Sequence, residues 1–294
     1  MAYAISPQDP SLTAALRRIA GDGLAKAIAA LDDPAPGALH DAVHTGRKTC
    51  KKLRALARLV RPGFSDYATV NTVLRDAARP LSGLRDAAVF VETFDALAGT
   101  APESLDPDRL APLRAALTHA RPDDPGATAD AVAQFRAQLQ AVADSVGDWS
   151  LKGKDAAILH AGLQTAFGQA RKALKPAMKH PRGEKMHDLR KRVKVHWYHA
   201  RLLGPIWPAM MDPHRDAAGA LGEMLGQHHD LVAFDARLEV GDLPETSVRL
   251  IRPLMHDRMD RLEHEAFALA RPLLAEPPDA LADRWVSWWK IARS

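Results

Sequence analysis

The sequence predicts an all-α fold that consists of two tandem, duplicated four-helix bundles. Strand-forming residues are sparse among the 294 residues, whereas Ala, Leu and Arg dominate, and this composition is typical of helical proteins. Two motifs also recur in the second half of the chain at an almost constant distance from their first copies. We therefore expect one bundle over residues 1–150 and a second over residues 151–294.

In the first half, proline- and glycine-containing segments separate the expected helices, and the 21 prolines are expected to punctuate the chain between helices. Ser11 is the expected N-cap of the first helix. The expected helices cover residues 12–31, 37–61, 66–98 with a break near Pro80, 106–120 and 127–146.

The second half is expected to repeat this order after the GDW segment at residues 147–149. Ser247 is a candidate cap for the last long helix, and the Trp-rich segment RWVSWWKIA at residues 284–292 is expected to pack against the bundle. The expected helices cover residues 154–175, 184–203, 213–238 and 247–270.

One expected helix, VHTGRKTCKKLRALARLVR at residues 43–61, has a cationic face and no acidic residue. At about 100° per residue, Leu53, Leu56, Ala57 and Val60 lie opposite that face, so we expect them in the core. The cationic arc is a candidate ligand-binding surface. Its residues are His44, Arg47, Lys48, Lys51, Arg54 and Arg58.

A second helix, MHDLRKRVKVHWYHARLL at residues 186–203, repeats this pattern 143 residues later. Its candidate residues are His187, Arg190, Lys191, Lys194 and Arg201. Trp197 stands where the first copy has Arg54, so this site is expected to be less cationic. His196 lies on the apolar side of the helix and is expected in the core, whereas His228 is expected at the surface.

Positive charge is concentrated around these two helices. Residues 44–61 hold seven Lys or Arg and no acid, and residues 171–194 hold ten Lys or Arg and two acids. The two stretches therefore carry +15, although the whole chain carries only +4. A single charged helix face is usually just solvated, but two such faces in register indicate a polyanionic partner.

A second pair of segments supports the duplication. LSGLRDAAVF at residues 81–90 is similar to LGQHHDLVAF at residues 225–234, at an offset of 144 residues. Arg85 then corresponds to His229, and Asp86 to Asp230. We expect the two carboxylates to orient a neighbouring Arg or His rather than to hold a metal. Arg85 is expected to be either a ligand of the polyanion or a salt-bridge partner within its bundle.

These paired motifs resemble those of the CHAD domain, the conserved histidine α-helical domain. That family carries a His-x-x-Arg-x-x-x-Lys helix twice, and each copy is followed by a Leu-x-x-(Arg/His)-Asp segment. The resemblance covers about residues 8–275. Its first copy reads His44, Arg47, Lys51 and then Arg85-Asp86, and its second reads His187, Arg190, Lys194 and then His229-Asp230.

The resemblance implies two helical bundles related by a pseudo-two-fold axis, with a basic central cleft or channel that binds inorganic polyphosphate. It also suggests a location at polyphosphate granules. Some family members carry an attached triphosphate-tunnel domain. The Glu-x-Glu-x-Lys strand motif of that domain is missing from this sequence, so we expect a stand-alone CHAD protein.

The residue types suit this ligand. Polyphosphate is negatively charged at every phosphate and has no bases to read, so its binder needs a row of cations, which positions i, i+3, i+4 and i+7 of a helix supply. Arginine contributes forked donors and lysine mobile point charges. Histidine gains a charge near pH ~6.5, so His44 and His187 are expected to strengthen binding at lower pH. Affinity is expected to fall steeply with salt.

Nucleic acid is the main alternative partner, because a basic face does not select among polyanions. Single-strand binders usually add aromatic stacking platforms, and the basic helices hold only Trp197 and Tyr198, which favours polyphosphate. An enzyme of polyphosphate or nucleotide metabolism is less favoured, because no acidic metal ligands accompany the basic faces. We therefore expect no catalytic residue, no cofactor and no metal site, although His40 and His44 have a metal-compatible spacing.

Compartment signals are few. Cys50 is the single cysteine, which excludes an intramolecular disulfide. The first residues show no basic segment followed by an apolar run, and no stretch approaches the roughly 18 apolar residues of a membrane span. We expect a cytoplasmic protein without a membrane partner, and the oligomeric state stays open.

Overall fold

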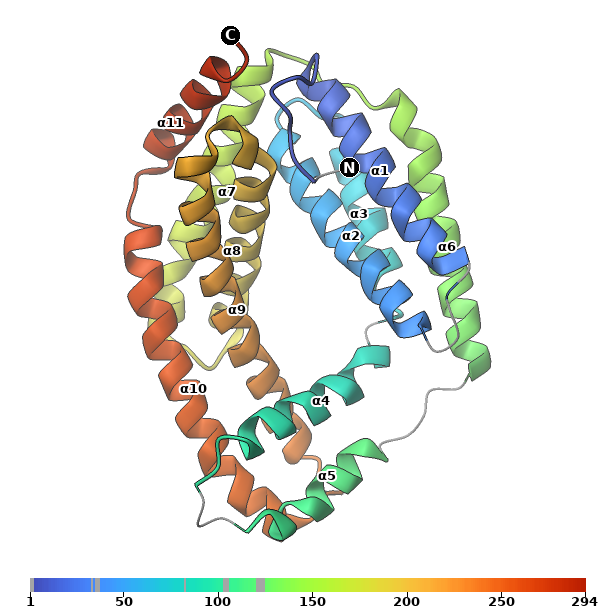
Figure 1. The fold of residues 1–294 in the computed structure, drawn as a ribbon, viewed down its shortest axis with the longest axis vertical. Helices are drawn as coiled ribbons and strands as arrows, with labels where there is room; N and C mark the ends of the chain where they lie inside the picture. Colours follow the sequence, from blue (N-terminus) through green and yellow to red (C-terminus); the bar gives the residue numbers. More distant parts are fainter. Residues whose placement is uncertain (1–2, 33, 35–37, 82, 103–105, 120–124) are drawn as a thin grey trace.

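The computed structural model describes residues 3–32, 34, 38–81, 83–102, 106–119 and 125–294. Within those residues it contains eleven α-helices and no β-strand, so the all-α prediction is confirmed. Figure 1 shows two columns of helices that meet at one end of the molecule.

The first column contains α1 (Leu12–Asp32), α2 (Leu39–Val60), α3 (Tyr67–Ala77) and α6 (Pro125–Ser145), which pack against one another. Ser11 caps α1 as expected, because its Oγ accepts a hydrogen bond from the Ala14 amide at 3.1 Å. The apolar arc of α2 is buried as predicted, with Leu53, Leu56 and Val60 each at most 3% exposed.

The second column contains α7 (Asp155–Lys179), α8 (Glu184–Leu203), α9 (Pro208–Leu238), α10 (Glu245–Leu273) and α11 (Pro278–Ile291). Helix α8 packs between α7 and α9, α10 packs on α9, and α11 packs on α7. The bounds of α8 coincide with the predicted range. Trp285 and Trp289 of α11 are 0% and 6% exposed, so the Trp-rich segment packs into the core as expected.

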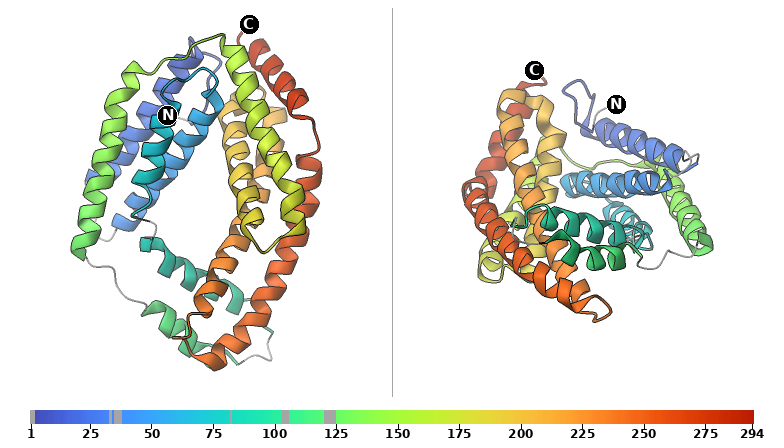
Figure 2. Two further views of the ribbon diagram at one scale, coloured as in Figure 1. Left: turned by 180° about the vertical axis from the view of Figure 1, so that it is seen from behind. Right: turned by 60° about the horizontal axis from the view of Figure 1, so that its bottom comes forward.

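Helices α4 (Gly83–Ala98) and α5 (Ala111–Thr118) leave the first column and pack on α9 and α10. Figures 1 and 2 show them crossing between the columns at the end remote from the termini. A separate apolar core forms there. It includes Phe94, Leu97 and Leu113 from the first half and Phe234, Ile251 and Met255 from the second. Helices α4 and α5 therefore bury apolar side chains against the second half, and the proposed boundary near residue 150 stays a prediction.

The two columns meet where α2 contacts α7 and α8. A Cβ added at Gly162 of α7 would lie 1.8 Å from the Leu59 carbonyl oxygen of α2, so only glycine permits this approach. His199 of α8 is fully buried and its Nε2 donates a hydrogen bond to the Ala55 carbonyl oxygen of α2 at 2.9 Å. These two contacts hold α2 against α7 and α8, and α8 is the helix that repeats the charge pattern of α2.

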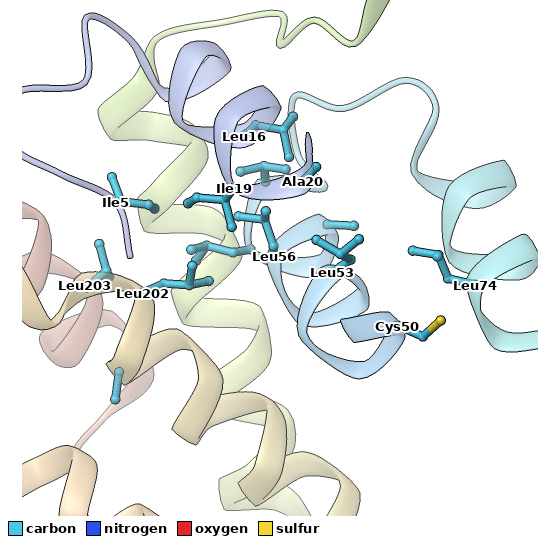
Figure 3. Close-up of a cluster of buried hydrophobic side chains, with 14 of the residues drawn as sticks. Ile5, Leu16, Ile19, Ala20, Cys50, Leu53, Leu56, Leu74, Leu202 and Leu203 are labelled. Carbon is cyan, nitrogen blue, oxygen red and sulfur yellow. The ribbon is translucent and has the colours of Figure 1, made fainter. Parts of the chain in front are cut away.

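The N-terminal segment closes this junction from one side. Ile5 is 1% exposed, and Figure 3 shows it between Leu202 and Leu203 of α8 and Ile19 of α1. The Ile5 amide donates to the Leu202 carbonyl oxygen at 2.7 Å. At the start of α1, the Leu12 amide donates to Oδ2 of Asp155, the first residue of α7, at 2.8 Å.

Two expectations about helix ends are wrong. Several prolines lie inside helices rather than between them, among them Pro176, Pro213 and Pro253. Tertiary packing on neighbouring helices offsets the hydrogen bond that each proline removes. Ser247 does not cap α10, which begins at Glu245. It is buried inside the helix and its hydroxyl donates to the Arg109 carbonyl oxygen at 2.7 Å.

In the described ranges, every helix is too short or too polar to cross a membrane.

Candidate functional site

The cationic arc of α2 divides into exposed and anchored side chains. His44, Lys48 and Lys51 are exposed. Arg47 is half-buried and its Nη1 donates to the Leu81 carbonyl oxygen at 3.0 Å. Arg54 is also half-buried, and its Nε donates to Oδ1 of Asn71 on α3 at 3.1 Å. The arc therefore combines mobile lysines with guanidinium groups that are held in place by their neighbours.

The corresponding cations of α8 include side chains that pack against α9. Lys191 is exposed, while His187, Arg190, Lys194 and Arg201 are half-buried. Two glycines of α9 leave room for these long side chains. A Cβ added at Gly222 would lie 3.2 Å from both Cδ and Cε of Lys194, and one added at Gly226 would lie 3.8 Å from Nε of Arg190. The aliphatic stem of Lys194 and the guanidinium group of Arg190 therefore lie against the backbone of α9.

Trp197 occupies the place where α2 carries Arg54. Nζ of Lys194 lies 4.9 Å from the centroid of the Trp197 ring, and Cζ of Arg201 lies 5.0 Å from the same centroid. The indole Nε1 would meet a Cβ at Gly219 of α9 at 3.0 Å. The substitution of Trp for Arg therefore removes one charge and orders the two cations that flank it.

The cations of the two helices share one region. The pKa of Lys194 is lowered by burial and further by Arg190 and by Lys48 of α2, although Glu223 acts in the opposite direction. The pKa of Lys52 on α2 is lowered by burial and then by Arg201 of α8. A cation of one helix that lowers the pKa of a lysine on the other helix lies close enough to share a ligand with it.

Several candidate cations of the two helices have no described carboxylate partner at ion-pair distance. Among described residues, six candidate cations form no ion pair within 4.0 Å of a carboxylate: Lys48, Arg54, Arg58, Lys191, Lys194 and Arg201. Elsewhere Arg114 pairs with Asp95 at 2.7 Å and Arg18 with Asp9 at 2.7 Å. Cations that are grouped without a carboxylate at ion-pair distance raise the local potential and favour an anionic ligand.

Each motif histidine lines a pocket. One pocket, of about 140 Å³, is lined by His44, Arg47 and Leu81 among others. The other, of about 340 Å³, is lined by His187, His229 and Leu225 among others. His44 and His187, and likewise Leu81 and Leu225, are corresponding positions of the two sequence motifs. The structure thus places the same motif residues around a pocket in each half of the chain.

His187 and His229 form a stacked pair in the larger pocket, with ring centroids 4.4 Å apart and an interplanar angle of 29°. Burial, followed by Arg190 and His187, lowers the pKa of His229 to about 4. Burial, followed by Lys191 and Arg190, also lowers the pKa of His187. Burial and the neighbouring cations therefore oppose protonation of His187 and His229, and the expected strengthening of binding at lower pH stays a prediction.

The Leu-x-x-(Arg/His)-Asp segments contribute three further predicted residues. Arg85 and Asp86 belong to helix α4, but their side chains lie outside the described residues. Asp230 follows His229 on α9 and is half-buried. The proposed orienting roles of the two carboxylates stay predictions.

His196 and His228 are both buried, although only His196 was expected in the core. His196 is 1% exposed, as expected for a core residue, and it forms an Nε2–Nε2 contact of 2.7 Å with His214. His228 is likewise 1% exposed and is hydrogen-bonded to Glu263 at 3.0 Å, so the expectation that it lies at the surface is wrong. Its partner is 35 residues away in sequence, and no local pattern could have indicated the contact.

Sequence reasoning also missed Lys52 and Tyr3. Lys52 lies at the edge of the cationic arc of α2, next to the buried Leu56, and its neighbours Tyr3 and Arg201 come from distant segments. A basic residue that borders such an arc is the one signal in the sequence that could have indicated Lys52.

Comparison with known proteins identifies the family. The CHAD domain model matches residues 22–239, from within α1 to the end of α9. The expected extent of about residues 8–275 was therefore too long, since the N-terminal segment, α10 and α11 lie outside the match. No curated protein matches the chain. With about three quarters of its length matched by the family model, the chain belongs to the CHAD domain family.

Proposed function

We propose that this protein binds inorganic polyphosphate through α2 and α8, the paired cationic helices of a duplicated fold. The observation that carries the proposal is the set of six cations from both helices that form no ion pair with a described carboxylate, among them Lys48 of α2 and Lys194 of α8. Lys52 of α2 and Arg201 of α8 lie against the same Tyr3 ring, at 5.5 and 5.8 Å from its centroid, so one polyanion can contact both helices at once. Membership of the CHAD domain family supports the same ligand.

The duplication is part of the proposal. Corresponding motif residues line a pocket in each half, which is what a pseudo-two-fold relation between α2 and α8 requires. In this account the basic region between the helices is the cleft along which polyphosphate lies, and a repeating polyanion matches a repeating array of cations. Association with polyphosphate granules would follow from such binding.

Polyphosphate is favoured over nucleic acid by the environment of the aromatic residues. The Trp197 ring already contacts Lys194 and Arg201, and Tyr198 is only 7% exposed. Neither ring offers the open face on which a base would stack. We also propose binding without catalysis.

Competition tests the choice of ligand. Labelled long-chain polyphosphate is bound to the full chain, and unlabelled polyphosphate or single-stranded DNA is added at equal phosphate concentration. We expect polyphosphate to displace the label at a concentration at least about tenfold lower than DNA. Equal displacement by DNA would contradict the choice of polyphosphate, and release of orthophosphate with Mg²⁺ present would contradict a role limited to binding.

A further inference from the structure

The N-terminal segment, residues 3–11, lies outside the residues that match the family model and ties the two columns together. Arg18 of α1 donates from Nη2 to the Ala4 carbonyl oxygen at 2.9 Å and from Nε to Oδ1 of Asp9 at 2.9 Å. Arg293, near the C-terminus, donates from Nη1 to the Asp9 carbonyl oxygen at 2.6 Å. With Ile5 bonded to α8, this N-terminal segment is held at both ends.

Tyr3 begins the segment and lies between cations of the two helices. Its hydroxyl donates to the Lys52 carbonyl oxygen of α2 at 2.7 Å. Nζ of Lys52 lies 5.5 Å from the centroid of its ring, and Cζ of Arg201 of α8 lies 5.8 Å from it. The ring also packs edge-on against Tyr198, with centroids 5.9 Å apart.

These contacts form one alternating row of cations and rings. The order is Lys52, Tyr3, Arg201, Trp197 and Lys194, with cation-to-centroid distances of 5.5, 5.8, 5.0 and 4.9 Å. Like charges would otherwise drive the side chains apart, and the negative faces of the aromatic rings offset that repulsion. A row held in this way loses little side-chain freedom when a ligand binds.

We propose that Tyr3 is a positioning residue that holds Lys52 and Arg201 in one array, and that Lys52 is a further phosphate-binding residue. This inference rests on the proposed binding of polyphosphate. It extends the site from the paired motifs to a segment outside the family match and to a lysine at the edge of the α2 arc. The polyanion then passes from α8 to α2 across the row.

The test measures binding of labelled long-chain inorganic polyphosphate to the full chain over a salt series. Tyr3→Leu removes the ring, and we expect a roughly 3- to 10-fold lower affinity with a salt dependence shallower by about one phosphate contact. Tyr3→Phe keeps the ring and should restore binding to within about twofold of wild type. Lys52→Gln alone should reproduce the loss seen with Tyr3→Leu.

A double-variant background separates positioning from general stability. When Lys52→Gln and Arg201→Gln are both present, Tyr3→Leu should cause no further loss of affinity. The same loss in that background, or wild-type binding by both Tyr3→Leu and Lys52→Gln, would overturn the inference. If Tyr3→Leu does not fold, unchanged binding by Lys52→Gln is sufficient to overturn it. Wild-type protein that fails to bind polyphosphate at low salt would instead refute the proposed function itself.

Discussion

Replacing Gly222 by Ala should weaken ligand binding while leaving the fold as stable or more stable. The added Cβ would lie 3.2 Å from Cδ and Cε and 3.4 Å from Nζ of Lys194. These contacts are tighter than most, and the flexible lysine is the part that can move. Alanine in a helix is favoured over glycine by about 1 kcal/mol, which offsets the crowding.

The magnitude follows from the charge that is displaced. A hydrogen bond to a charged group contributes about 1.5–3 kcal/mol, and a displaced lysine loses part of it, so we expect roughly a 3- to 10-fold lower affinity. The slope of log affinity against log salt should also become shallower by somewhat under one unit. Titration of labelled polyphosphate at several salt concentrations measures both quantities, and thermal unfolding reports stability.

Gly21→Ala is the matched control, because a Cβ at this position of α1 would meet no atom within 4 Å. It should raise stability similarly and leave binding unchanged. In a Lys194→Gln background, Gly222→Ala should have no further effect on affinity. Wild-type affinity and salt dependence for Gly222→Ala would refute the argument that this glycine positions Lys194.

Three further predictions concern the junction and the histidine pair. Burial lowers the pKa of His199 to about 4, so its contribution to the free energy of unfolding should be complete above pH 6.5 and should be lost as pH falls towards 4. The total contribution is about 3 kcal/mol. In denaturant unfolding, His199→Gln should lose less stability than wild type over that pH range. Gly162→Ala should destabilise the fold by more than about 2 kcal/mol in the same assay, because its Cβ would overlap the Leu59 carbonyl oxygen; wild-type stability would contradict the close approach of α7 to α2. A bound polyanion should raise the pKa of His229 from about 4, so affinity for polyphosphate should increase as pH falls from about 6.5 towards 4. The increase should be smaller in His229→Asn. An identical pH profile for this variant and wild type would exclude His229 as the cause of the pH dependence.

Much of the fold could be predicted because helix periodicity is a local property. The buried arc of α2 follows from apolar spacing, and the end of α8 follows from the Gly204-Pro205 dipeptide that comes after it. The packing of α4 and α5 on α9 and α10 could not be predicted in this way. The apolar side chains of Phe94 and Leu97 indicate that one face is buried, but not which helices cover it.

The site was partly predictable for the same reason. The residues of each cationic arc share a helix face, and the structure places Lys52 of α2 and Arg201 of α8 against the same Tyr3 ring. Lys52 and Gly222 depend on contacts with Arg201 and Lys194 that only the tertiary fold creates. The lowered pKa of His229 has the same origin, since it reflects burial beside cations of a different helix.

The most direct test of the central claim reverses one exposed charge on each paired helix. Lys48→Glu with Lys191→Glu changes α2 and α8, while Lys154→Glu with Lys290→Glu makes the same change of net charge at exposed positions elsewhere. The measurement is binding of labelled long-chain polyphosphate over a salt series. The account predicts at least a tenfold loss of affinity and a shallower salt dependence for the first pair only. Equal losses in both pairs, or no loss in the first, would contradict a polyphosphate site on the paired helices.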